Sequence, residues 1–188
     1  MEEYYDETFE DQQFSQESWD DRLYENCRFR NCRFMNLDMD GVVFRDCEFE
    51  ACEWLNLGFG GVKLQGLRFR DSRWLGIQLD SSLPEPIKLH FMDSRLEQVG
   101  CEELSFRELS IKNSQLWECH FANCDLRDAD FSGTDCSGTI WEDNDLRESD
   151  FRAARNYQFD PQQNRIKGAY FSVPEVLVFL QALGIEIE

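Results

Sequence analysis

Positive charge is scarce in this sequence. The 188 residues include 19 Lys and Arg against 38 Asp and Glu, for a formal net charge of -19 and a pI near 4.4. Such a surface repels the phosphate backbone of nucleic acids, which argues against direct binding of DNA or RNA. The charge favours a basic partner; the alternative interpretation is that it only keeps a long exposed surface soluble.

Long apolar runs are missing as well. No stretch approaches the roughly 18 residues that a membrane-spanning helix needs. The first residues, MEEYYDETFEDQQ, are acidic where a secretory leader is basic and then apolar. We therefore expect a cytoplasmic protein that has no contact with a membrane.

Catalytic motifs are absent too. The two histidines, His90 and His120, lie in no HExxH motif and in no triad context, and no glycine-rich phosphate loop leads from a strand to a helix. The many carboxylates are regularly spaced, without the unequal environments that separate a catalytic acid from a base. The sequence predicts a protein that is not an enzyme and has no catalytic, cofactor or metal site.

A five-residue period dominates what is present. Large apolar residues occupy every fifth position from Phe9 to Leu79, and the period resumes two residues out of phase from Phe91 to Phe151. The position two before each of these residues is apolar or small almost throughout. A step of five fits neither an α-helix nor one continuous strand, so the chain must turn once in every repeat.

The turns have suitable residues. Gly, Asn and Asp recur two positions after the central apolar residue, for example at Asn31, Gly61 and Asp128, where tight turns favour them. Four corners give a square coil of 20 residues, with side chains stacked about 4.8 Å apart along each wall. We therefore predict an all-β, quadrilateral β-solenoid, with roughly seven coils in a rod about 35 Å long.

The repeat resembles that of the pentapeptide-repeat proteins. The segments that carry the resemblance are NCRFMNLDM, RDCEFEACEWLNL and ANCDLRDADFSGTD, within residues 22–155. The resemblance implies a right-handed quadrilateral β-helix. The last stretch, NYQFDPQQNRIKGAYFSVPEVLVFLQALGIEIE, resembles the closing module of the Qnr, microcin-immunity and albicidin-immunity branch. Membership of that branch implies an acidic homodimer that mimics DNA and protects DNA gyrase, and in some members topoisomerase IV, from a toxin or a quinolone, which gives antibiotic resistance or self-immunity.

Three segments follow from these patterns. Residues 1–21 are expected to form a flexible or capping arm, because Glu7, Gln12 and Glu17 occupy positions that should face inward. Residues 22–155 form the solenoid, with an interruption near residues 80–90. Residues 156–188 form a capping and dimerisation module.

The C-terminal module contains one expected helix. Ser172 is placed as its cap, Pro174 lies in its first turn, and Gly184 ends it before a short strand, Ile185 to Ile187. Its apolar stripe favours a two-fold interface, although a helix that only covers its own coil would leave a monomer. The residues expected in the dimer interface are Val176, Leu177, Phe179, Leu180, Leu183 and Ile185.

The interruption DSSLPEPIKLH holds two residues more than a whole number of repeats and must leave the coil as a loop or bulge. A tolerated surface insertion and a partner-contacting loop are both open interpretations. In the second interpretation the contact residues are Ser82, Leu83, Pro84, Glu85 and Pro86.

Acidic residues of the second half fall into columns. With a 20-residue coil, Asp125 lies beside Asp145 and Asp130 beside Asp150, about 5 Å apart. Glu108, Asp128 and Glu148 form a third column. Two or three such columns approach the charge density of a duplex, which makes these seven residues the predicted partner-binding surface. An adjacent column of Arg107, Arg127 and Arg147 partly neutralises that wall.

The eight cysteines occupy inner positions of the repeat, so packing is favoured over metal binding. Cys27 and Cys47, or Cys32 and Cys52, would stack within disulfide reach, but a reducing cytosol argues against such bonds. The leading hypothesis is a topoisomerase-protecting protein with DNA gyrase as its partner. The alternatives are a structural or scaffold repeat protein with another basic partner, and a gyrase inhibitor without protective activity.

Overall fold

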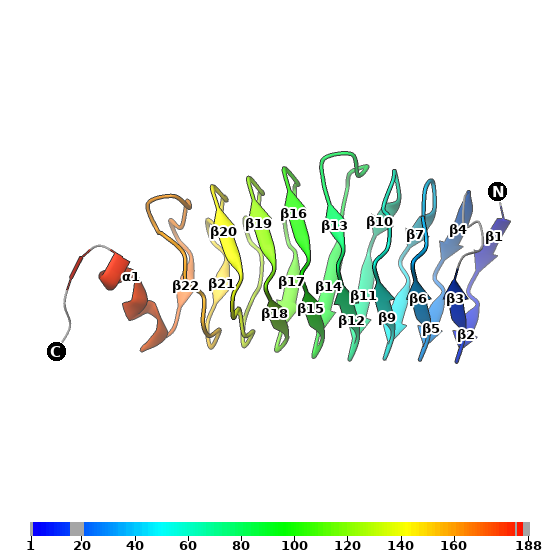
Figure 1. The fold of residues 1–188 in the computed structure, drawn as a ribbon, viewed down its shortest axis with the longest axis horizontal. Helices are drawn as coiled ribbons and strands as arrows, with labels where there is room; N and C mark the ends of the chain where they lie inside the picture. The colour runs from blue at the N-terminus through cyan, green and yellow to red at the C-terminus, as the bar shows by residue number, and fades with distance from the viewer. Residues whose placement is uncertain (1, 16–20, 183, 186–188) are drawn as a thin grey trace.

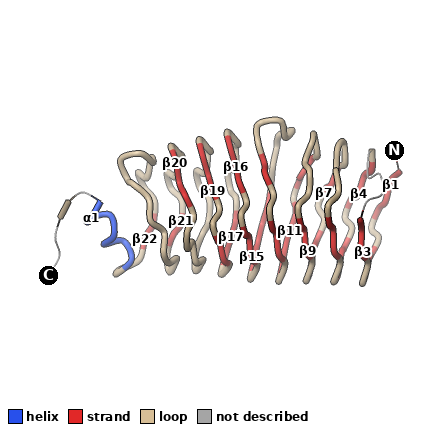
Figure 2. The backbone as a smooth tube through the Cα atoms, viewed as in Figure 1, coloured by secondary structure: helices blue, strands red, loops and turns tan. Residues whose placement is uncertain are grey.

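The chain winds into a rod of stacked rectangular coils, with the two termini at opposite ends (Figure 1). The computed structural model describes residues 2–15, 21–182 and 184–185. Short parallel strands form the sides of each coil and turns form its corners (Figure 2). The predicted all-β quadrilateral solenoid is confirmed.

Strands one coil apart pair in parallel and build four walls, which we number in chain order. The first wall contains β1 (Glu2–Tyr5), β4 (Arg22–Glu25), β7 (Val43–Arg45) and β10 (Lys63–Gln65). The second wall contains β2 (Thr8–Glu10), β5 (Arg28–Arg30), β8 (Glu48–Glu50), β11 (Leu67–Arg70), β14 (Leu89–Met92) and β17 (Ser110–Lys112), and farther along β21 (Asp150–Phe151) and β22 (Tyr170–Phe171).

The other two walls complete the coil. The third contains β3 (Gln13–Ser15), β6 (Arg33–Met35), β9 (Glu53–Leu55), β12 (Arg73–Leu75), β15 (Arg95–Glu97) and β18 (Gln115–Trp117). The fourth contains β13 (Gln78–Leu79), β16 (Gly100–Glu102), β19 (His120–Ala122) and β20 (Ile140–Glu142). Isolated bridges such as Asp125↔Asp145 continue the walls where no strand is assigned.

The register shows why a five-residue period gives this fold. Phe29 lies beside Phe49 on the second wall, and their rings stack with centroids 4.7 Å apart. Phe69 and Phe91 extend the same ladder at 4.8 Å. The corners take the left-handed conformation that Asn and Asp tolerate better than other side chains, as at Asn31, where φ is 51°. Apolar residues therefore point inward on all four sides, and the polar residues between them point outward.

The solenoid begins earlier than residue 22. Strands β1, β2 and β3 already pair with β4, β5 and β6, and Tyr4 stacks on Tyr24 at 4.9 Å. Residues 2–15 are thus an end coil that covers the core, and the expected boundary at 21 is corrected. Glu7 and Gln12 occupy inner positions without burial cost, because both are exposed at the open end of the rod. Glu17 lies outside the described residues.

All eight cysteines are buried and free, as the packing interpretation predicts. Most of their thiols donate weak hydrogen bonds to backbone carbonyls, as from Cys47 Sγ to Tyr24 O at 3.4 Å. Burial raises the pKa of the Cys47 thiol to about 12, so the thiol stays protonated and unreactive. No helix in the described parts of the chain is long and apolar enough to cross a bilayer.

Candidate functional site

The predicted acidic columns exist, and they lie on two walls and one corner. The bridge between Asp125 and Asp145 places them side by side on the first wall, and the bridge between Asp130 and Asp150 does the same on the second. The three remaining members of the predicted surface occupy the corner column between these walls with positive φ: Glu108, Asp128 and Glu148.

Arginine and lysine side chains neutralise the aspartates of both walls. Asp125 accepts a hydrogen bond from Arg127 Nε at 2.7 Å and another from Arg107 Nε at 3.1 Å. The same arrangement recurs one coil later, where Arg147 Nε lies 2.7 Å from Asp145 Oδ1. The Arg127 hydrogen bond is the main reason that the pKa of Asp125 falls to about 2.

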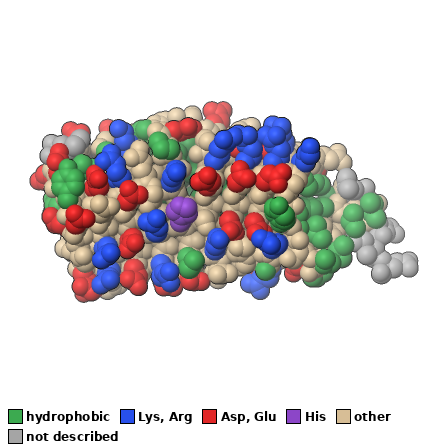
Figure 3. All heavy atoms as spheres, turned by 180° about the vertical axis from the view of Figure 1, so that it is seen from behind, with side chains coloured by type: hydrophobic (Ala, Val, Ile, Leu, Met, Phe, Trp, Pro, Cys, Tyr) green, Lys and Arg blue, Asp and Glu red, His purple; other side chains and the backbone are tan. Residues whose placement is uncertain are grey.

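The second-wall aspartates are engaged in the same way. Lys112 Nζ lies 2.6 Å from Asp130 Oδ2, and Arg152 Nη2 lies 2.5 Å from Asp150 Oδ2. These two aspartate side chains are 26% and 16% exposed, so they present little free charge to a partner. One broad side of the rod accordingly shows basic and acidic side chains intermixed (Figure 3).

The fourth wall has the unbalanced acidic surface. Its outward positions carry Asp38 and Asp40 in an early coil, and Glu102 and Glu142 on β16 and β20, all exposed. The corner columns on both sides add Asp21, Glu103, Glu118 and Asp143. In the described part of this wall and its two corner columns there is no Lys or Arg.

On this wall, among the described residues, His120 Nε2 lies within hydrogen-bond distance of Glu142 Oε2, at 3.0 Å. Small residues leave much of the wall flat, because Gly58, Gly100 and Ala122 take outward positions. Sequence analysis missed this surface. The sequence does contain a signal for it: in every fourth repeat, from Met39 to Trp141, the residues on either side of the central apolar residue are never Lys or Arg.

The interruption forms a loop that stands out from the rod after β13 (Figure 1). Phe69 pairs with Phe91 instead of with a residue 20 positions away, so the loop absorbs the two extra residues. Leu83 is 5% exposed and anchors the loop to the core, which corrects its place among the partner-contacting residues. Ser82, Glu85 and Pro86 are exposed and Pro84 is partly exposed. Their role in partner contact stays a prediction.

The C-terminal module closes the rod. A 3-10 turn, η1 (Glu175–Leu177), leads into a short helix, α1 (Val178–Ala182). Phe179 is 7% exposed and packs its ring 5.0 Å from that of Phe159. The expected Ser172 cap is wrong, because the turn starts at Pro174 without a side-chain cap and the Ser172 hydroxyl accepts a hydrogen bond from Ala153 N at 3.0 Å.

Most of the expected interface residues stay accessible. Val176, Leu177 and Leu180 are partly exposed, and Ile185 is 47% exposed. Hydrophobic side chains gather at this end of the molecule (Figure 3). Phe179 belongs to the core and is removed from the interface residues, whereas Leu183 and Ile187 lie outside the described residues. Dimerisation stays a prediction.

Comparison with known proteins identifies the repeat. Residues 110–152 match the family model for pentapeptide repeats, in eight copies. No curated protein matches the chain.

Three solved structures are similar over most of the chain. A trypsin-treated form of QnrB1, a plasmid-mediated fluoroquinolone resistance protein, is 17% identical with a TM-score of 0.49, covering 99% of this chain and 100% of that one. Full-length QnrB1 is 15% identical with a TM-score of 0.47, covering 97% and 100%. HetL, a pentapeptide-repeat protein involved in heterocyst differentiation regulation from the cyanobacterium Nostoc sp. strain PCC 7120, is 10% identical with a TM-score of 0.41, covering 89% and 84%.

Proposed function

We propose that this pentapeptide-repeat protein binds DNA gyrase in place of duplex DNA and protects the enzyme from a topoisomerase poison. The observation that carries the proposal is the fourth wall, whose exposed acidic residues are not accompanied by Lys or Arg in the described residues. The resemblance of the repeat and of the C-terminal module to the topoisomerase-protecting branch supports DNA gyrase as the partner. Topoisomerase IV is a second target, bound through the same acidic wall.

Charge density supports a partner that normally holds DNA. From Asp21 to Asp143 the wall and its corners span six coil steps, about 29 Å at the usual strand spacing. The acidic residues along this length amount to roughly half of the linear charge of a duplex, which carries one charge per about 1.7 Å. A flat wall with this density of negative charge is complementary to the cationic groove of a DNA-binding enzyme. The second wall, on the opposite side, is less suitable because its acidic residues are paired with arginines.

The experiment is gyrase supercoiling, titrated with the purified protein in the presence and absence of a poison that traps cleaved DNA. Protection predicts that supercoiling recovers in the poisoned reaction at protein concentrations that leave the unpoisoned reaction unchanged. If the protein inhibits supercoiling and does not restore it in the poisoned reaction, the protein is a gyrase inhibitor without protective activity. No effect at any ratio with several poisons would reject gyrase as the partner and leave a scaffold role.

Charge-neutralised variants test the surface separately. Neutralising four fourth-wall residues (D38N, D40N, E102Q, E142Q) should weaken protection about tenfold or more, since each exposed contact contributes about 0.2–1 kcal/mol. The matched control changes the net charge equally on the other three walls (E25Q, E48Q, E50Q, E53Q) and should act like the wild type. If the wild type protects and both variants behave alike, the function stands and the fourth-wall assignment is wrong.

A further inference from the structure

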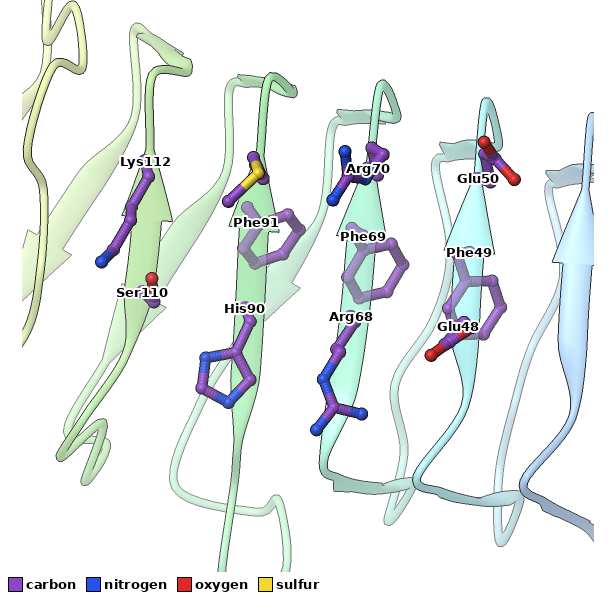
Figure 4. A pocket seen from close by; sticks show the side chains of 11 residues that line it. Glu48, Phe49, Glu50, Arg68, Phe69, Arg70, His90, Phe91, Ser110 and Lys112 are labelled. Carbon is purple, nitrogen blue, oxygen red and sulfur yellow. The ribbon is translucent and has the colours of Figure 1, made fainter.

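The second wall, opposite the acidic one, carries a groove of a different chemistry. An open hollow of about 450 Å³ crosses β8, β11, β14 and β17 (Figure 4). Its rims come from outward residues of these strands, and its floor is formed by the strands at Phe49, Phe69 and Phe91, whose side chains are buried in the core. The lining residues that matter here are Glu48, Arg68, Arg70, His90, Met92 and Lys112.

Two arginines of this groove lack acidic partners. Arg68 and Arg70 are exposed on either side of Phe69, and neither forms an ion pair with any described residue. The neighbouring glutamates on β8 are already engaged by the preceding coil, as Arg28 Nε lies 3.3 Å from Glu48 Oε2. Glu50 is held similarly by Arg30 at 3.4 Å. An acidic protein thus exposes two adjacent guanidinium groups that are not neutralised, where most of its other arginines are paired.

The register places His90 beside Arg68, and Met92 beside Arg70. Lys112 follows Met92 one coil later, but its ammonium is already paired with Asp130 at 2.6 Å. Figure 4 shows Arg68 and His90 next to each other along one rim of the groove. Burial lowers the pKa of His90, and the charges of Arg68, Lys88 and Lys112 lower it further, against a smaller opposing effect of Glu108. Basic groups therefore outnumber acidic ones among the charges that act on His90.

The positive stretch is short. It runs from β11 to β17, two strand steps or about 10 Å. Glu48 and Glu50 bound it on one side and Asp130 on the other. A duplex laid along the wall would meet these carboxylates, and the net charge of -19 would repel it at longer range.

A compact ligand avoids that repulsion. The hollow lies in the size range of small-molecule sites. Met92 is 37% exposed and offers an apolar contact on one rim of the groove, between Arg70 and Lys112. Guanidinium groups such as those of Arg68 and Arg70 bind phosphate oxygens in a bidentate manner.

We propose that this groove binds a compact phosphate ligand of nucleotide size, with its phosphates on Arg68 and Arg70 and its apolar part against Met92. This site is separate from the fourth wall, so the proposal does not depend on gyrase binding.

The two histidines provide a direct test. The chain has only His90 and His120, and they lie on opposite walls. We expect magnesium-free ATP, titrated into the intact protein, to shift the imidazole NMR signals of His90 to saturation and to raise its pKa. The signals of His120, which is paired with Glu142, should not move.

Variants and competing anions decide the assignment. R68Q with R70Q should weaken ATP binding by about tenfold or more, whereas R33Q with R95Q on the third wall should stay within about twofold. Circular dichroism should show both variants folded. Equal shifts of both histidines, unchanged affinity of the R68Q/R70Q variant, or binding of a 12-base-pair duplex or hexaglutamate as tight as that of ATP would overturn the proposal.

Discussion

Asp125 shows how a single side chain decides what a surface can do. Its carboxylate faces outward, but Arg127 binds it with Nε and with Nη2 at 2.7 Å and 2.5 Å. The negative charge of Asp125 is therefore neutralised within the wall and is not free to bind a partner. Asp38 is also an outward-facing aspartate, but it lies on the fourth wall, where the described residues of the wall and its corner columns include no Lys or Arg.

The pairing of Asp125 predicts a pH-dependent stability. Its pKa is about 2 in the folded protein and 3.8 ordinarily, so the ionised carboxylate stabilises the fold above about pH 4. This stabilisation is lost as the pH falls from about 4 to about 2. We expect D125N to lower the free energy of unfolding by less than about 1 kcal/mol at pH 7, because the pair is at the surface.

Thermal unfolding of wild type and D125N at pH 7, 4 and 2.5 measures this difference. The difference in melting temperature should shrink steadily with the pH. Asp128 is the control, since it has no ion pair among the described residues, and D128N should give a difference that does not depend on pH in this way. A constant difference for D125N would show that its ion pair does not stabilise the fold.

At the scale of the elements, inner hydroxyl groups connect successive coils beside the third wall. Ser72 N donates to Ser94 Oγ at 3.1 Å, and Ser94 N donates to Ser114 Oγ at 3.0 Å. The ladder continues with Ser114 N and Thr134 Oγ1 at 3.2 Å. Each buried hydroxyl therefore accepts a hydrogen bond from a backbone N–H of the preceding coil.

Removing one hydroxyl should leave such a donor unpaired in the core. S94A deprives Ser72 N of its acceptor, and we expect the free energy of unfolding to fall by about 1–3 kcal/mol. Urea denaturation of S94A and of S15A, an exposed serine on β3, provides the comparison. Equal midpoints for the two variants would contradict a stabilising role of the ladder.

The sequence predicts these elements well because apolar residues must face inward, so a period of five can only be met by a chain that turns in every repeat. It predicts less about the outward residues. Asp125 and Asp145 fall into the expected column, but whether a neighbouring arginine folds back onto them depends on side-chain directions that spacing does not give. The expectation for the inner Glu7 and Gln12 was wrong for a related reason, since burial of an inner position depends on whether coils cover it on both sides.

The whole molecule is a rod with unlike sides. Its acidic fourth wall and its groove of unpaired arginines face away from each other, so the two proposed binding sites do not overlap. Its ends differ as well: the first coil presents Tyr4 and Phe14 at the edge of the core, while the C-terminal end is closed by Phe179.

The C-terminal end carries the prediction of a dimer. Leu177 and Leu180 remain partly exposed after Phe179 has covered the core, and joining two copies there would give a rod of about 70 Å or more. We expect sedimentation to give twice the chain mass of 22.3 kDa, and L177D with L180D to give one chain mass with the fold retained. F179A should instead lower the free energy of unfolding by about 3–5 kcal/mol, because it opens the core of each copy. A wild-type protein that sediments as a single chain at micromolar concentration would assign the whole module to capping, and gyrase would then meet a rod of half that length.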